Sequence, residues 1–230
     1  MKYLLIFPFF IFAFSTFSQQ DFPKNNLIIH MDPGVGNILI DFSGYNGKSE
    51  HNPWFGFAAG LNYERQFNDK HAIITGLDLQ TITSFYVVEF YPSIPIDSSE
   101  YLLSENPSHS YMLAIPLIYS FGKSFDRIRI GLELGIVNSF GIASANSQII
   151  TNYYGESTKY KWKTYPESGF FYCLDARLGV NFTYQFSDVF ALGLTPYARL
   201  NIYTPNNYKS VFHNWNVNFA LNFKYTFHSK

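Results

Sequence analysis

Apolar and polar residues alternate with a period of two along most of this chain. Side chains of a β-strand point to opposite faces in turn, so each alternating stretch predicts one two-faced strand. The final stretch is the clearest, with apolar Val217, Phe219, Leu221, Phe223, Tyr225 and Phe227 between Asn, Ala, Lys and Thr residues. The same pattern predicts strands at 55–64, 127–136, 172–183, 190–202 and 216–227, and in weaker form at 37–43, 72–82 and 111–121. The sequence therefore predicts eight strands.

The connections between these strands alternate in length. Long segments at 43–53, 88–109, 144–168 and 205–214 alternate with short ones at 67–70, 122–126 and 186–188. This alternation is typical of outer-membrane barrels, which have tight periplasmic turns and long outer loops. An even strand number then places both termini in the periplasm. We predict an all-β, eight-stranded, antiparallel, up-and-down transmembrane β-barrel over residues 36–230.

The first eighteen residues read as a cleavable signal peptide. Lys2 precedes an apolar run from Leu4 to Phe14, and small residues follow before Gln19. The run is interrupted by Pro8 and is shorter than the roughly 20 residues that a membrane-spanning helix needs. We therefore expect export after cleavage at Ser18, with residues 19–35 as a periplasmic segment before the barrel.

Alternation alone leaves open which face of the barrel points outward. A secreted, lipocalin-like carrier would hold the apolar face inside and the polar face in water. Here the polar face consists mostly of small residues, only 14% of the chain is charged, and 20% is aromatic. Aromatic residues such as Tyr119, Phe121, Tyr184 and Phe186 gather near strand ends, like the girdles at membrane interfaces. We therefore expect the apolar face to meet lipid in the outer membrane, with the lipocalin-like carrier as an alternative.

Three features together resemble the PorT-like small outer-membrane β-barrels of Gram-negative bacteria. They are the export signal ending near Gln19, the Ile115-Pro116-Leu117 segment, and the aromatic-rich last strand closing at Phe227. The resemblance implies that the barrel-insertion machinery recognises the last strand. The PorT-like family includes components linked to protein secretion. The chain departs from the pattern because His228, Ser229 and Lys230 follow the final aromatic residue.

Charged residues of both signs fall on the face predicted to line the lumen. They are Asp41, Glu64, Asp78, Arg129, Glu133, Asp175, Arg177, Arg199 and Lys224. Glu133 and Arg177 are expected at similar height on adjacent strands, with Asp175 within reach of the same pair. Because buried charges are costly unless they are paired, we predict a salt-bridge network that plugs the lumen. The alternative is a narrow ion path gated by these pairs.

The long segment 144–168 contains a candidate binding surface. Tyr160, Lys161, Trp162 and Lys163 alternate aromatic and basic side chains, which places them on opposite faces of an extended hairpin. One interpretation is a surface for lipid phosphates and sugars of the outer leaflet. The alternative is an ordinary strand pair that continues above the membrane.

Signals for catalysis, metals and cofactors are weak. The sequence lacks HExxH, GxSxG and P-loop motifs, and a single cysteine, Cys173, permits neither a disulfide nor a cysteine-based zinc site. His51, His109, Ser110 and His213 near the outer rim leave a lipid-A-modifying enzyme as an alternative function. A net charge of −1 argues against nucleic acid. We expect a non-enzymatic barrel without cofactor or metal, whose partners are outer-membrane lipid, the insertion machinery and an unidentified protein.

Overall fold

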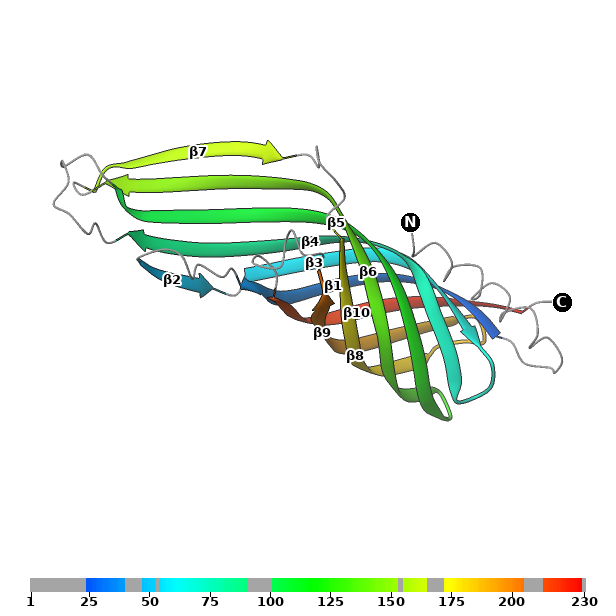
Figure 1. Ribbon diagram of the computed structural model, residues 1–230. Coiled ribbons are helices and arrows are strands. Elements are labelled where there is room, and N and C mark those ends of the chain that lie inside the picture. The colour runs from blue at the N-terminus through cyan, green and yellow to red at the C-terminus, as the bar shows by residue number, and fades with distance from the viewer. Residues whose placement is uncertain are drawn as a thin grey trace, which may run out of the picture.

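A computed structural model describes residues 24–39, 47–52, 54–90, 101–152, 155–164, 172–204 and 213–228. These residues form one antiparallel sheet of ten strands (Figure 1). The strands are β1 (Lys24–Leu39), β2 (Gly47–Asn52), β3 (Trp54–Gln66), β4 (His71–Phe90), β5 (Tyr101–Phe125), β6 (Ile128–Asn152), β7 (Ser157–Thr164), β8 (Tyr172–Gln185), β9 (Phe190–Tyr203) and β10 (His213–His228). The described residues include no helix of the length and apolarity needed to cross a membrane.

Eight of these strands close into a barrel. The order around it is β4-β3-β1-β10-β9-β8-β6-β5, and pairing of β4 with β5 completes the ring. β1 and β10 pair from Lys24 with His228 to Leu39 with His213, so the first and last strands lie side by side. The predicted eight-stranded antiparallel barrel is therefore confirmed.

Successive side chains along each strand point alternately into the barrel and out of it, which gives the wall an inner and an outer face. Along β8 the inward residues from Cys173 to Thr183 are buried, and outward Leu178 and Phe182 are exposed. The enclosed interior contains a small apolar cluster of Ile28, Ile74 and Ile118, surrounded by polar and charged side chains. Cys173 is buried and points inward, as its place in the alternation predicts.

Short turns connect the strands at one end, which we call the short-turn end of the barrel; the β5–β6 turn is shorter than the predicted 122–126, because β5 continues to Phe125 and β6 begins at Ile128. In the β3–β4 turn the Asn68 side chain accepts hydrogen bonds from the backbone nitrogens of Lys70 and His71, each at 2.9 Å. Asn and Asp favour turns because they make such local bonds. In the β5–β6 turn Asp126 adopts the left-handed backbone region, with φ of 52°.

The first strand differs from the prediction. We expected it at 37–43, after a periplasmic segment at 19–35, but β1 begins at Lys24 and alternates from there through His30 and Asp32. Pro33 and two glycines hide this alternation in the sequence. A Cβ atom on Gly34 would lie 1.6 Å from Asn218 Oδ1, so the close approach of β1 to β10 requires glycine there. The barrel thus starts at least twelve residues earlier than the predicted boundary at residue 36. The predicted signal peptide lies outside the described residues.

The segments expected to be long loops include strands that continue beyond the barrel. β4, β5 and β6 extend past the ring, β2 pairs with the end of β4, and β7 pairs with the end of β6. These parts form what we call the projecting sheet, which rises from the end opposite the short turns (Figure 1). The loop prediction was therefore wrong over the described part of 88–109, because mixed polar residues without clear alternation also form strands when they pair with neighbours. Within 144–168 the alternative of a strand pair that continues beyond the barrel is confirmed, since β6 and β7 pair from Ser144 with Thr164 to Thr151 with Ser157.

Candidate functional site

The outer surface of the barrel is apolar around its circumference. Four different strands contribute the exposed residues Phe57, Leu134, Leu178, Phe219 and Phe223, and each exposes between 40% and 56% of its surface. Water-facing strands would carry polar residues at these positions, because exposed apolar surface of this extent marks a membrane or protein interface. The lipocalin-like alternative is therefore wrong, since its apolar face would have to lie inside.

The interior carries paired charges. The structure places Glu64, Asp78, Glu133, Asp175, Arg177, Arg199 and Lys224 in the lumen, all buried, with Arg129 close to the short-turn end. Asp41 lies outside the described residues. His30 and Asp32 are buried in the lumen as well and join this set.

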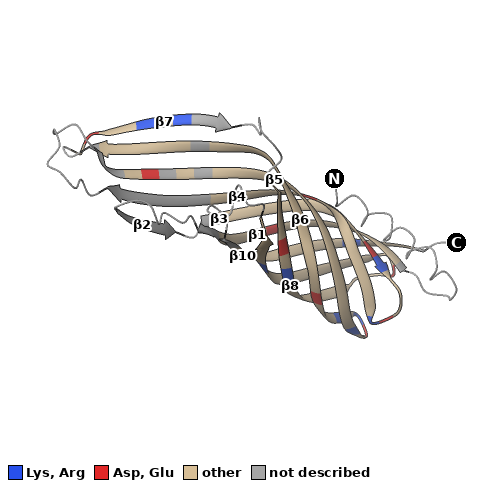
Figure 2. Cartoon of the chain, in the orientation of Figure 1, with Lys and Arg blue, Asp and Glu red and all other residues tan. Residues whose placement is uncertain are grey.

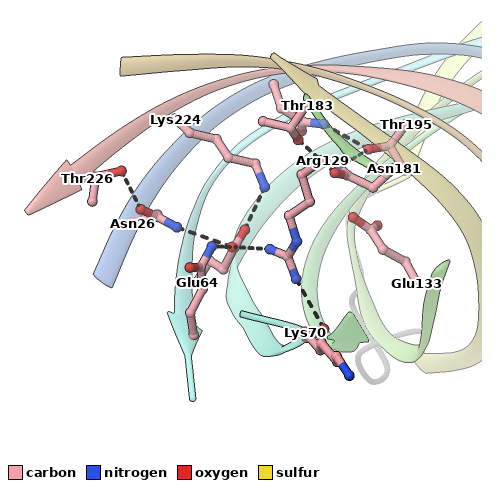
Figure 3. Close-up of polar contacts among 12 residues, drawn as sticks. Asn26, Glu64, Lys70, Arg129, Glu133, Asn181, Thr183, Thr195, Lys224 and Thr226 are labelled. Carbon is pink, nitrogen blue, oxygen red and sulfur yellow. Dashed lines mark hydrogen bonds and ion pairs between the residues drawn. The ribbon is translucent and has the colours of Figure 1, made fainter. Parts of the chain in front are cut away.

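The cluster at the short-turn end is centred on Glu64, as Figure 3 shows. Lys224 Nζ lies 2.6 Å from one carboxylate oxygen, and Arg129 lies 3.4 Å from the other. The amides of Asn26 and Gln66 also donate to that second oxygen, at 3.1 and 2.8 Å. The contacts join side chains of β1, β3, β6 and β10, so the cluster ties distant parts of the ring together.

A second cluster lies above it. Arg177 is 3.0 Å from Glu133, so this predicted neighbour pair does lie in contact. The Arg177 guanidinium also stacks on the Tyr197 ring at 3.8 Å, and Tyr197 donates a hydrogen bond to Asp32 at 2.8 Å. Asp175 does not join this pair; it contacts Arg199 instead.

His30 is a central residue that the sequence reasoning missed, because the first strand was misplaced. Its two ring nitrogens contact Asp32 at 2.7 Å and Asp78 at 2.9 Å. An ionised carboxylate only accepts hydrogen bonds, so an imidazolium ring that donates from both nitrogens satisfies both contacts. The described part of the interior thus holds five carboxyl side chains, four Arg or Lys side chains and His30. The alternation of Leu27, Ile29 and Met31 would have placed His30 on the inner face.

The third cluster lies nearest the projecting sheet. Arg199 contacts Asp175 and donates to Gln80 at 2.7 Å and to Ser139 at 3.1 Å. Asn201 donates to the other Asp175 oxygen at 3.1 Å. The terminal nitrogens of Arg199 are therefore occupied by neighbours on three other strands.

The two cavities that border these clusters are small. A cavity of about 10 Å³ borders His30, Glu133 and Arg177, and another of about 30 Å³ borders Arg199. One water needs roughly 10–15 Å³ of such volume, so each cavity holds one to a few waters. Interiors of eight-stranded barrels are just wide enough to be filled by side chains, as here.

The projecting sheet carries its own charges (Figure 2). Tyr160 and Lys161 of β7 are exposed, together with Lys159. In the register of β7 with β6, Lys159 lies opposite Ile149 and Tyr160 opposite Gln148, so Lys159 and Lys161 share one face and Tyr160 lies on the other. The backbone of Trp162 and Lys163 continues this strand, and their side chains lie outside the described residues.

The other sequence candidates give no assembled catalytic site among the described residues. His109 contacts the Thr83 hydroxyl at 3.1 Å, and Ser110 lies next to it on β5. The side chains of His51 and His213 lie outside the described residues. The described residues contain no group of three or more His, Cys, Asp or Glu side chains placed to hold a metal ion.

The closed ring, its apolar exterior and its paired interior define an eight-stranded transmembrane β-barrel of the outer-membrane type. No protein-family model matches the sequence, and no curated protein matches it. Among solved structures the chain is similar to Neisserial surface protein A, with 12% identity, a TM-score of 0.44 and coverage of 87% of this chain and 97% of that one. It is also similar to OprG from Pseudomonas aeruginosa, with 12% identity, a TM-score of 0.39 and coverage of 90% and 97%. The outer-membrane protease OmpT from Escherichia coli has 10% identity, a TM-score of 0.40 and coverage of 92% and 100%.

Proposed function

We propose that this protein is a non-enzymatic outer-membrane anchor that presents the projecting sheet to a protein partner at the cell surface. The observation that carries the proposal is the contrast between a filled barrel and a sheet that extends away from it. A filled barrel offers no room for a substrate, whereas strands outside the ring leave exposed edges and faces. The resemblance to PorT-like barrels favours a partner in protein secretion.

The edge strand β7 is the contact that we favour within the sheet. Among the described residues β7 pairs only with β6, so its other edge carries backbone groups available to an added strand. Extended partner segments bind exposed sheet edges through such backbone hydrogen bonds. Exposed Lys159 and Lys161 would favour a partner segment with acidic residues.

Site-specific crosslinking in intact cells tests this contact. A photoreactive amino acid replaces Lys161 in one variant and Ser187, an exposed residue of the short β8–β9 turn, in the matched control. We expect a defined crosslinked protein from position 161 and not from position 187. An absence of product at 161, or the same product from both positions, would overturn the proposed contact.

Conductance in planar bilayers tests the plugged interior separately. We expect the wild-type protein to form no stable channels, because paired side chains fill the lumen. Arg177→Ala removes the partner of Glu133 and one wall of the smaller cavity, so brief openings are expected only in this variant. Stable, sizeable channels in the wild type would show that the interior is a pore.

A further inference from the structure

The edge strand β7 carries different side chains on its two faces (Figure 1). Lys159 and Lys161 share one face, Tyr160 lies between them on the other, and all three are exposed. On β6, Ile149 and Ser147 lie opposite the two lysines, so the neighbouring strand supplies no carboxylate. Neither lysine forms an ion pair with another described residue. The strand therefore presents two unpaired cations and one aromatic ring at its edge.

A carboxylate of this chain does lie in the same row of the sheet, but farther away. Glu105 of β5 lies opposite Ile149, which lies opposite Lys159, so two strand spacings separate Glu105 from Lys159. Strands are about 4.8 Å apart, which places the two residues about 10 Å from each other across the sheet. That distance exceeds the Debye length of about 8 Å at physiological salt, so Glu105 offsets the lysine charge weakly. A carboxylate on a strand added to β7 would lie only about 5 Å away.

A strand added to the edge of β7 would continue the rows of the sheet. Residues directly opposite each other on neighbouring strands point to the same face, and pairs of opposite charge or of aromatic and β-branched residues stabilise the pairing. Residues opposite Lys159 and Lys161 would therefore share the face of the lysines. The residue between them would lie beside Tyr160 on the other face.

The same lysines disfavour a second copy of this chain at the edge. An antiparallel pair of two β7 strands centred on Tyr160 would place Lys159 of each copy opposite Lys161 of the other. Like charges directly opposite each other destabilise a sheet, and lysines on edge strands are a common protection against self-pairing. The edge therefore selects against its own sequence and for a segment of opposite charge.

We propose that β7 recognises an extended partner segment in which one apolar or aromatic residue separates two acidic residues. The proposal rests on the proposed function, in which β7 binds a partner protein, and adds the pattern that the partner carries. Backbone hydrogen bonds supply the affinity of such strand additions, and alternate side chains supply their specificity. Spacing is decisive, because two adjacent acidic residues point to opposite faces and only one of them meets a lysine.

Binding of two synthetic peptides tests this pattern. The full-length protein is refolded in phosphatidylcholine nanodiscs, and the readout is the backbone amide chemical shifts of β7. Both peptides hold two glutamates in the same threonine- and valine-rich sequence. One valine separates the glutamates in the first peptide, and the glutamates are adjacent in the second. We expect saturable binding of the first and about two- to fivefold weaker binding of the second, because one of two charge pairs is lost.

The diagnostic variant combines Lys159→Glu with Lys161→Glu. Reversal of both charges should abolish binding of the first peptide and should allow binding of a peptide with lysines in place of its glutamates. The matched control combines Lys70→Glu with Lys123→Glu, because both of these lysines are exposed at the short-turn end and the net charge changes by the same amount. The control should leave the affinity for the first peptide unchanged.

Three results would overturn the proposed pattern. They are the absence of saturable binding of the first peptide to the wild type, equal affinity for the two glutamate peptides, and equal loss of binding in the two double variants. The crosslink from position 161 in cells decides separately whether any partner contacts β7, so the pattern can fail while the proposed contact stands. A crosslink from position 161 to another molecule of this protein would show that a second copy occupies the edge, and it would also overturn the pattern.

Discussion

The barrel and the projecting sheet share the strands β4, β5 and β6, yet they arrange side chains differently. In the barrel part of β6, Leu132 and Leu134 are more than half exposed while Glu133 between them is only 3% exposed. Beyond the barrel, Ser147 and Ile149 on one face and Ile150 on the other are all partly exposed. The same strand thus has one enclosed face where the sheet closes and no enclosed face where it is open.

This difference assigns the two regions different roles: the barrel determines the stability of the protein, and the projecting sheet presents an exposed surface. Closure of the sheet buries the charged side chains, so each of them depends on its ion-pair and hydrogen-bond partners to offset the cost of burial. In the projecting sheet a charge keeps access to water and depends little on its neighbours. Substitutions of the same chemical type should therefore have large effects in the barrel and small effects in the sheet.

Removal of Glu64 should have the largest effect. Glu64→Ala leaves Lys224 and Arg129 without their carboxylate at the buried short-turn end. Breaking a buried ion pair by removing one partner costs about 3–5 kcal/mol, and the free energy of unfolding should fall by that amount. Urea unfolding of the refolded protein in lipid vesicles measures it.

Glu105→Ala in the projecting sheet is the matched control for that experiment. Glu105 is partly exposed, and its loss should change the free energy of unfolding by no more than about 0.5 kcal/mol. Equal effects of the two substitutions would show that burial does not distinguish the two regions.

A charge on the lipid-facing surface should have the next largest effect. Leu134 is 54% exposed on the outer face of β6, far from both strand ends. Arginine at the middle of the membrane costs about 2–4 kcal/mol, so Leu134→Arg should lower the free energy of unfolding in vesicles by this amount. Ser147→Arg, on the same strand in the projecting sheet, should be neutral. A neutral result for Leu134→Arg would contradict the assignment of this face to lipid.

Removal of two tyrosine hydroxyls, one in the interior and one near the rim, compares how much each hydrogen bond stabilises the barrel. Tyr197 donates to the buried carboxylate of Asp32, whereas Tyr172 donates to the partly buried amide of Asn138. Hydrogen bonds to charged groups contribute about 1.5–3 kcal/mol and neutral ones about 1 kcal/mol. Tyr197→Phe should therefore destabilise the barrel about twice as much as Tyr172→Phe in the same unfolding assay. The reverse order would show that the interior cluster tolerates loss of one member.

The barrel itself could be predicted from the sequence because closure and lipid impose strict alternation. Residues of β8 and β10 alternate without interruption, and the structure keeps their predicted faces. The position of the first strand was predicted wrongly because Pro33 and Gly34 break the apolar pattern where β1 approaches β10 closely. With that strand misplaced, the histidine that bridges two carboxylates could not be assigned to the lumen.

Of the projecting sheet, only the β6–β7 strand pair could be predicted, from the alternation of Tyr160, Lys161, Trp162 and Lys163; the other strands could not, for a different reason. Its strands are not selected by a lipid face or an enclosed face, so their sequences carry no regular pattern of burial. The ion pairs were only partly predictable, since Asp175 and Glu133 both lie near Arg177 in register, and side-chain reach alone directs Asp175 to Arg199. Such choices depend on the tilt and stagger of strands, which the alternation does not encode.

Substitution of Lys161 should have the smallest effect on stability, and it gives the sharpest test of the difference between the barrel and the projecting sheet. Lys161→Ala removes an exposed charge from an edge strand, so the free energy of unfolding should stay within about 0.5 kcal/mol of the wild type. If β7 contacts an acidic partner segment, the same substitution should still reduce the amount of partner that co-purifies from intact outer membranes. Glu64→Ala should show the opposite profile for whatever folded protein remains, with lower stability and unchanged partner per folded barrel. A loss of stability at Lys161 comparable to that at Glu64 would mean that the projecting sheet supports the barrel and is not a separate display surface.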